Sequence, residues 1–203
     1  MMITISTRNE DNYFLPEDGA LARQRLLQTL ALPSDAFISC YGFTLQEAYD
    51  AILEVDSKGF KQSLLLDYSQ GMGATAKPKI KHLIQNLKNG QVVLTTAGPK
   101  SSKTSSYFHV KGMVKFDPEK NKVPFCMEGS TNISISGFYQ SNTMRFFKNK
   151  VWSETFMTHH KEIKDWALKN LPHYQPKILA ENFDSIDYFF DNYVEETESK
   201  FLI

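Results

Sequence analysis

The sequence predicts an α/β fold whose sheet contains both parallel and antiparallel strands. The first observation is a strand–helix–strand succession: Phe37–Tyr41 and Ser63–Leu66 are short apolar runs, separated by a helical stretch that begins after Thr44. This order is typical of two parallel strands joined by a crossover helix. The second observation is a later hairpin, in which residues 118–122 form a turn between a strand containing His109 and a strand at Val123–Met127.

The remaining elements follow from apolar periodicity and from chain-breaking residues. Leucines at 21, 26, 27 and 30 predict a first helix, which the sequence Leu32-Pro33-Ser34-Asp35 ends. Thr44 with Glu47 matches a capping box and predicts the start of a helix that runs to about Asp56. A further helix, two strands and a long helix are expected at 80–87, 92–94, 144–147 and 151–170.

The bulk composition bounds the function less tightly than the fold. The 203 residues fit one domain, and no apolar run has the length of a membrane span. The N-terminus lacks a secretory pattern, so we expect a cytoplasmic protein, or a mature chain, without stable membrane association.

Cys40 and Cys126 lie in apolar runs and are expected to be buried free thiols. His159 and His160 are adjacent on the long helix and are expected at the surface or in packing.

Charge is zero overall but unevenly distributed. Ten lysines and two acids lie between Gly71 and Lys122, whereas seven acids and one lysine follow from Glu181. The basic stretch surrounds the residues considered next, as expected for a polyanionic ligand, although a solvated lysine face remains an alternative. The acidic tail either shields the basic face or keeps the chain end soluble.

Two polar clusters carry the chemistry. His109 and Lys111 are two residues apart, so on a strand both side chains would face the same space. A lysine ammonium neutralises phosphate oxygens, and an unprotonated imidazole beside it can attack phosphorus. Gly129-Ser130-Thr131-Asn132 follows the second hairpin strand, where the Ser130 hydroxyl and the Asn132 amide could bind the same anion.

At these residues the chain resembles the phospholipase D superfamily, whose hallmark is His-x-Lys-(x)4-Asp followed by Gly-Ser-x-Asn. The resemblance extends over about residues 36–148, from Tyr41-Gly42-Phe43-Thr44 through Leu64–Gln70 to Ser134–Gly137, Gln140 and Asn142. It implies a mixed β-sheet with helices on both faces, an α-β-α sandwich, with one motif per chain. The domain would span residues 1–203, with a C-terminal helix and an acidic, aromatic tail at about 151–203.

Two positions depart from the family pattern. Five residues separate Lys111 from Asp117 instead of four, so either the strand contains a bulge or Asp117 is not the equivalent residue. The short nuclease branch usually has a carboxylate next to the asparagine matched by Asn142, and this chain has Thr143 there.

The resemblance implies a metal-independent phosphodiesterase that requires no cofactor. His109, Lys111, Ser130 and Asn132 would be catalytic, and Lys103 and Arg145 would contact phosphate. Family members join two motifs in one active site, so a chain with one motif would act as a homodimer. Short members act mostly on nucleic acid, which favours a nuclease with DNA preferred over RNA, in a restriction or defence context. The alternatives are phosphodiester chemistry on a lipid or small metabolite, and an impaired nucleic-acid-binding module.

Overall fold

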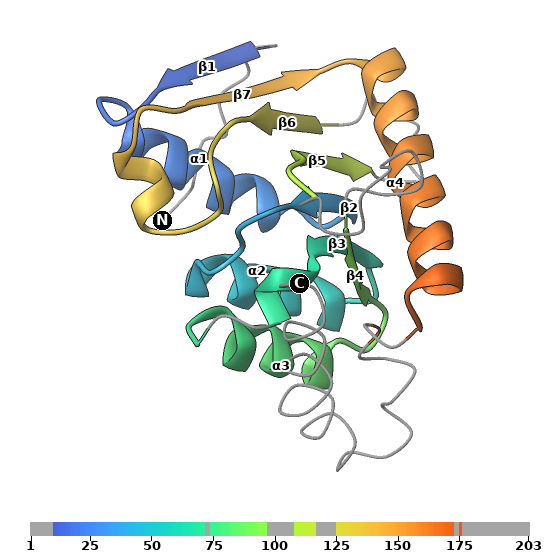
Figure 1. Ribbon diagram of the computed structural model, residues 1–203. Helices are drawn as coiled ribbons and strands as arrows, with labels where there is room; N and C mark the ends of the chain where they lie inside the picture. Colours follow the sequence, from blue (N-terminus) through green and yellow to red (C-terminus); the bar gives the residue numbers. More distant parts are fainter. Residues whose placement is uncertain (1–9, 72–73, 97–107, 117–124, 173–174, 176–203) are drawn as a thin grey trace, which may run out of the picture.

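The computed structural model describes residues 10–71, 74–96, 108–116, 125–172 and 175. A seven-stranded mixed sheet, of order β1-β7-β6-β5-β2-β3-β4, forms the centre of the molecule (Figure 1). The strands are β1 (Glu10–Phe14), β2 (Asp35–Cys40), β3 (Gln62–Asp67), β4 (Gln91–Thr95), β5 (Lys111–Phe116), β6 (Phe125–Gly129) and β7 (Thr143–Lys148). The helices are α1 (Gly19–Leu30), α2 (Gln46–Ser57), α3 (Ala76–Asn86) and α4 (Lys150–Asn170), with 3-10 turns η1 (Tyr68–Gly71) and η2 (Ser136–Tyr139).

The strand directions confirm both sequence arguments. β2, β3 and β4 pair in parallel, with α2 crossing between the first two. β5 and β6 form the expected antiparallel hairpin, and β5 also pairs antiparallel with β2. The alternation of side chains along these strands divides the apolar residues between the two faces of the sheet.

Helices cover both faces, as the α-β-α expectation requires. Ile38, Leu64 and Met113 face the larger core, which also contains the buried residues of α1, α2 and α3. Leu65 and Val93 face the opposite side and pack with Ile163 and Ala167 of α4. Figure 1 shows α4 crossing one end of the sheet on that side.

One buried histidine fixes α4 to the sheet. His160 is 2 % exposed, and its Nδ1 and Nε2 each lie 3.0 Å from a serine hydroxyl, of Ser39 and Ser63 respectively. Burial lowers the pKa of His160 to about 3, so the ring is neutral at ordinary pH. The expected packing role is therefore found at His160, whereas the neighbouring His159 is exposed.

The capping box expected at Thr44 is wrong. α2 begins at Gln46 with Leu45 in the cap position, and no side chain caps it. The backbone N–H groups of Thr44 and Leu45 instead donate to the carbonyl of Ile133, at 2.8 and 3.0 Å. These two bonds join the segment after β2 to the loop after β6. Leu45 accordingly has an extended backbone conformation, and the helix begins only at Gln46.

Candidate active site

The candidate site lies at the edge of the sheet where β2, β3 and β6 end and β5 and β7 begin. Antiparallel pairing of β5 with β2 and β6 places the start of β5 beside the ends of those two strands. The residues after one strand and before the next therefore converge, although they are far apart in the sequence. His109, Lys111, Ser130 and Asn132 all lie at this edge.

His109 and Lys111 are in contact. Lys111 Nζ lies 2.9 Å from His109 Nε2. An ammonium only donates, so Nε2 is the accepting and unprotonated nitrogen in this arrangement. His109 is exposed, while Lys111 is 8 % exposed, and burial lowers the pKa of Lys111. A nucleophilic nitrogen and a cation therefore face the same space at an open edge.

His109 lies outside β5, which differs from the strand expected for it. β5 begins at Lys111, and the backbone N–H of Phe108 donates to Asp67 Oδ2 at 2.5 Å instead of joining a ladder. The pairing of β5 with β2 runs without interruption from Lys111 to Phe116, so this stretch contains no bulge. Asp117 and Lys103 lie outside the described residues.

Asp67 is a site residue to which sequence reasoning gave no role. It is fully buried at the end of β3, and desolvation raises the pKa of its carboxyl group. Its Oδ1 accepts from the backbone N–H and the hydroxyl of Ser69, at 3.0 and 2.5 Å. Asp67 also interacts electrostatically with His109, so it brings negative charge toward the ring. A carboxylate at the end of an apolar strand is the signal that could have identified it.

The ring of Tyr41 completes the surroundings of the pair. Its centroid lies 5.0 Å from that of His109, and Lys111 Nζ lies 5.5 Å from the Tyr41 centroid. Tyr41 also donates its backbone N–H to the carbonyl of Val110 at 3.1 Å. The segment after β2 thus holds Val110, the residue between His109 and Lys111.

Ser130 is bonded within its own loop. Its hydroxyl donates to Asn142 Oδ1 at 3.1 Å and accepts from the backbone N–H of Thr143 at 3.0 Å. Its backbone N–H donates to the carbonyl of Thr143, also at 3.0 Å. Ser130 can donate to a phosphate only after it exchanges its bond to Asn142.

Asn132 packs against the segment that follows β2. A Cβ at Gly42 would lie 2.7 Å from Asn132 Cγ, so the close approach requires glycine. Asn132 Oδ1 is buried and has no hydrogen-bond partner among the described residues. The loop is further fixed by the Ile133 N–H, which donates to the carbonyl of Gly42 at 2.8 Å.

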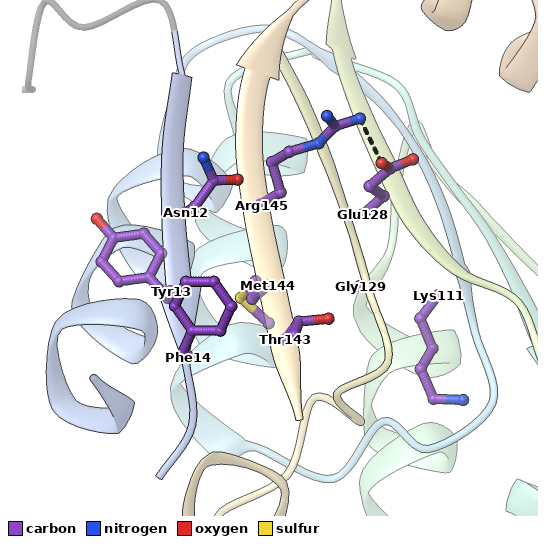
Figure 2. A pocket seen from close by; sticks show the side chains of 9 residues that line it. All are labelled: Asn12, Tyr13, Phe14, Lys111, Glu128, Gly129, Thr143, Met144 and Arg145. Atoms are coloured by element: carbon purple, nitrogen blue, oxygen red, sulfur yellow. Dashed lines mark hydrogen bonds and ion pairs between the residues drawn. The ribbon is translucent and has the colours of Figure 1, made fainter. Parts of the chain in front are cut away.

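A depression of about 470 Å³ adjoins Lys111 (Figure 2). Its other lining residues come from the antiparallel strands: Asn12, Tyr13, Phe14, Glu128, Gly129, Thr143, Met144 and Arg145. Thr143, which stands where the family usually has a carboxylate, is exposed and lines this depression.

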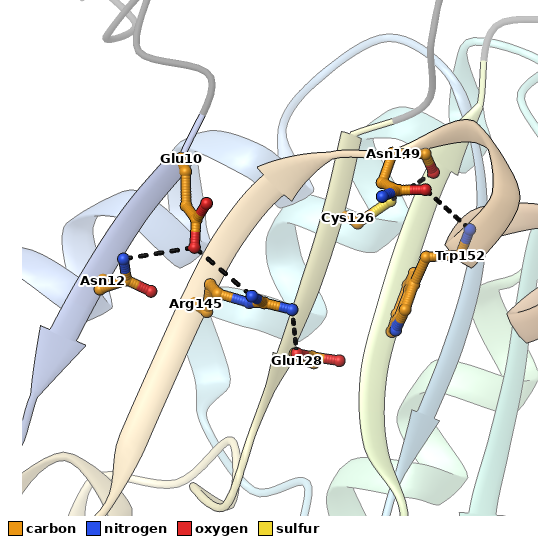
Figure 3. Close-up of polar contacts among 7 residues, drawn as sticks. All are labelled: Glu10, Asn12, Cys126, Glu128, Arg145, Asn149 and Trp152. Atoms are coloured by element: carbon orange, nitrogen blue, oxygen red, sulfur yellow. Dashed lines mark hydrogen bonds and ion pairs between the residues drawn. The ribbon is translucent and has the colours of Figure 1, made fainter.

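Arg145 is already paired in this structure. Figure 3 shows its guanidinium between Glu128 and Glu10, with N–O distances of 2.5 and 3.4 Å. It also lies over the ring of Phe147, 4.4 Å from the centroid. To bind a phosphate, as the sequence predicts, Arg145 would have to release these two carboxylates.

Both cysteines are buried thiols outside any disulfide, as expected, and burial raises the pKa of each to about 11. Within the described ranges, no three His, Cys, Asp or Glu side chains are grouped so as to hold a metal ion. Among the same residues, no helix is long and apolar enough to cross a membrane.

Of the lysines in the basic stretch that the structure describes, two are buried. Besides Lys111, Lys115 is 3 % exposed and its Nζ donates to the carbonyl of Leu30 at 3.2 Å. Lys77, Lys79 and Lys81 are half-buried on α3. The stretch is therefore not a uniformly solvated lysine face.

Comparison with known proteins supports the fold. No protein-family model and no curated protein matches the sequence. Among solved structures, NucT from Helicobacter pylori superposes with a TM-score of 0.65 at 17% identity, over 77% of this chain and 96% of that one. Nuc from Salmonella typhimurium, a phospholipase D family member, gives 0.62 at 15% identity, over 77% and 94%. TrmBL2, an archaeal chromatin protein, gives 0.51 at 11% identity, over 80% and 56%.

Proposed function

On the premise that this chain has the phospholipase D fold, we propose that it is a phosphodiesterase that cleaves nucleic acid, with DNA preferred over RNA. The observation that carries the proposal is the 2.9 Å contact between Lys111 Nζ and His109 Nε2 at an open sheet edge. The length of the chain agrees with this proposal, because the match covers nearly the whole length of NucT and Nuc, as expected for a short member with one motif.

The proposed reaction has two steps. Lys111 Nζ exchanges its bond to His109 Nε2 for one to a phosphate oxygen, and the freed Nε2 attacks phosphorus, forming a P–N bond as the P–O bond to the leaving oxygen breaks. A second, protonated His109 gives its proton to that oxygen, then takes a proton from water, which attacks phosphorus and breaks the P–N bond. Lys111 stabilises the charge on the phosphate oxygens in both steps, assisted by Ser130 and Asn132. No metal or cofactor takes part.

The second His109 would come from a second copy of the chain. Each chain supplies one His-x-Lys pair that is followed by Gly-Ser-x-Asn, so a twofold axis beside His109 would bring two such motifs to one phosphate. The position of His109 supports this arrangement, because its exposed ring lies outside the sheet and is accessible to another subunit. A cytoplasmic restriction or defence system is the context that we propose for such a nuclease.

A second candidate is a nucleic-acid-binding module without activity. Thr143 in place of the usual carboxylate favours it, and so does the structural similarity to TrmBL2, a chromatin protein with a novel mode of DNA binding. A third candidate is a phosphodiesterase acting on a lipid or a small metabolite. In the absence of metal, the first candidate would cleave nucleic acid, the second would cleave nothing, and the third would cleave a lipid or a small metabolite.

The test is cleavage of plasmid DNA in excess EDTA by wild type, His109→Ala and His159→Ala. The last variant is the matched control, because His159 is an exposed histidine on α4. We expect cleavage by wild type and His159→Ala and none by His109→Ala. Intact DNA with wild-type dimer would contradict the proposal, and cleavage of lipid instead would favour the third candidate.

A further inference from the structure

The depression beside Lys111 is lined mainly by residues of β1, β6 and β7. Its floor includes Gly129, whose Cβ would lie 2.3 Å from the carbonyl oxygen of Thr143, so a larger residue does not fit there. The lining residues run from β1 across β7 and β6 to Lys111 (Figure 2). Whatever occupies it would adjoin a phosphate held by Lys111 and His109.

The far side of the depression presents an aromatic ring. Phe14, at the end of β1, is 65 % exposed, which is unusual for a phenylalanine side chain. Figure 2 shows its ring beside Thr143 at the depression. An exposed aromatic face that lines the same depression as a phosphate-binding lysine matches the stacking surfaces of proteins that bind single-stranded nucleic acid.

Polar groups line the same depression. The amide of Asn12, the carboxylate of Glu128 and the guanidinium of Arg145 all contribute to its walls. Amide, carboxylate and guanidinium groups are those that hydrogen-bond the edges of nucleobases. A volume of about 470 Å³ is also within the range of about 300–1,000 Å³ that is typical of small-ligand sites.

We propose that this depression is a subsite for an unpaired nucleobase of the strand whose phosphate Lys111 and His109 hold, with the base stacked on Phe14 at the end of the depression away from Lys111. The inference rests on the proposed function and specifies its substrate class as single-stranded nucleic acid. In a duplex, neighbouring base pairs cover both faces of a base, so the ring of Phe14 can stack only on a base that is unpaired or displaced.

The test measures binding, using His109→Ala protein in EDTA so that nothing is cleaved. Fluorescence anisotropy compares a labelled oligo(dT) with a strand of equal length whose sugars are all abasic, since both strands carry the same phosphates. We expect oligo(dT) to bind about 5- to 100-fold more tightly. Adding Phe14→Ala should remove this preference, and adding Phe14→Trp should retain it. Adding Val151→Ala, at a similarly exposed apolar position on α4, should leave it unchanged.

Three results would overturn the subsite. One is equal affinity for the two strands, and another is a preference for oligo(dT) that survives Phe14→Ala. The third is a change from dimer to monomer on Phe14→Ala in light scattering, because the ring would then be a subunit contact. Binding by an inactive variant does not depend on cleavage, so failure of the subsite is distinguishable from failure of the proposed function, which is measured on wild type.

Discussion

The buried carboxylate of Asp67 determines where His109 lies. Its Oδ2 accepts the backbone N–H of Phe108, the residue directly before His109, at 2.5 Å. This bond holds the chain against the end of β3 just before it enters β5, where His109 lies beside Lys111. Thr143 provides no carboxylate, whereas Asp67 is a buried acid that interacts electrostatically with the ring.

Asp67→Asn should lower kcat while leaving KM nearly unchanged. The amide has one oxygen, so it cannot accept from both Phe108 and Ser69, and a misplaced nucleophile can cost up to about 100-fold in rate. Steady-state cleavage of an oligonucleotide measures both constants. Ser69→Ala is the control, since it removes only one bond to Oδ1. A wild-type kcat for Asp67→Asn would show that Asp67 does not position His109.

Gly42→Ala should reduce activity through Asn132. The added Cβ would lie 2.7 Å from Asn132 Cγ and 2.9 Å from its Nδ2, so the amide must move. In an Asn132→Ala background the two shortest contacts are absent and only the one to the Cβ of residue 132, at 3.0 Å, remains, so the two losses should be strongly non-additive. Rates for the two single variants and the double variant measure the coupling. Additive losses would mean that Gly42 acts on the site by another route.

At the scale of elements, His160 makes the attachment of α4 dependent on pH. Its folded pKa of about 3 is below the unfolded value of 6.5, so the unfolded chain binds the extra proton first as pH falls. The stability that this ring contributes is fully present above pH 6.5 and is lost progressively as pH falls toward 3. The slope is at most about 1.4 kcal/mol per pH unit.

His160→Gln should therefore flatten the loss of stability between pH 6.5 and 4, although it should lower stability at neutral pH by disturbing the bonds to Ser39 and Ser63. Urea unfolding at several pH values measures both effects. His159→Gln, at the exposed neighbouring position, should keep the wild-type slope. If His160→Gln has that slope as well, the buried ring is not the source of the pH dependence.

Sequence patterns predicted most helices and strands well, because the spacing of apolar residues along a single element indicates its type. Apolar periodicity locates α1, α3 and α4, and apolar runs locate β2, β3 and β4. The capping box failed because Thr44 and Leu45 donate to Ile133, a contact that only the folded chain creates. The start of β5 was misplaced for a similar reason, since Asp67 takes the N–H of Phe108 from the ladder.

The candidate site was predictable only in part. The pairing of His109 with Lys111 follows from a spacing of two residues, and the structure brings these side chains together. The partners of Arg145 were not foreseeable, because Glu10 reaches it through the pairing of β1 with β7, across more than half of the chain. Lys103 and Arg145 as phosphate contacts stay predictions.

At the scale of the whole molecule, a shared site makes activity depend on pairs of intact subunits. If one phosphate needs two copies of His109, a mixed dimer of wild type and His109→Ala is inactive. After subunit exchange at constant total protein, activity should therefore fall as the square of the wild-type fraction. A linear fall would mean that each chain carries a complete site.

The stereochemical course at phosphorus tests the proposed reaction most directly. The substrate is an oligonucleotide with a phosphorothioate of one configuration at the scissile bond, cleaved in isotopically labelled water with EDTA. Attack by His109 followed by attack by water gives two in-line displacements, each of which inverts phosphorus, so the product should retain the original configuration. Inversion would mean that water attacks directly, and it would contradict a phosphohistidine at His109.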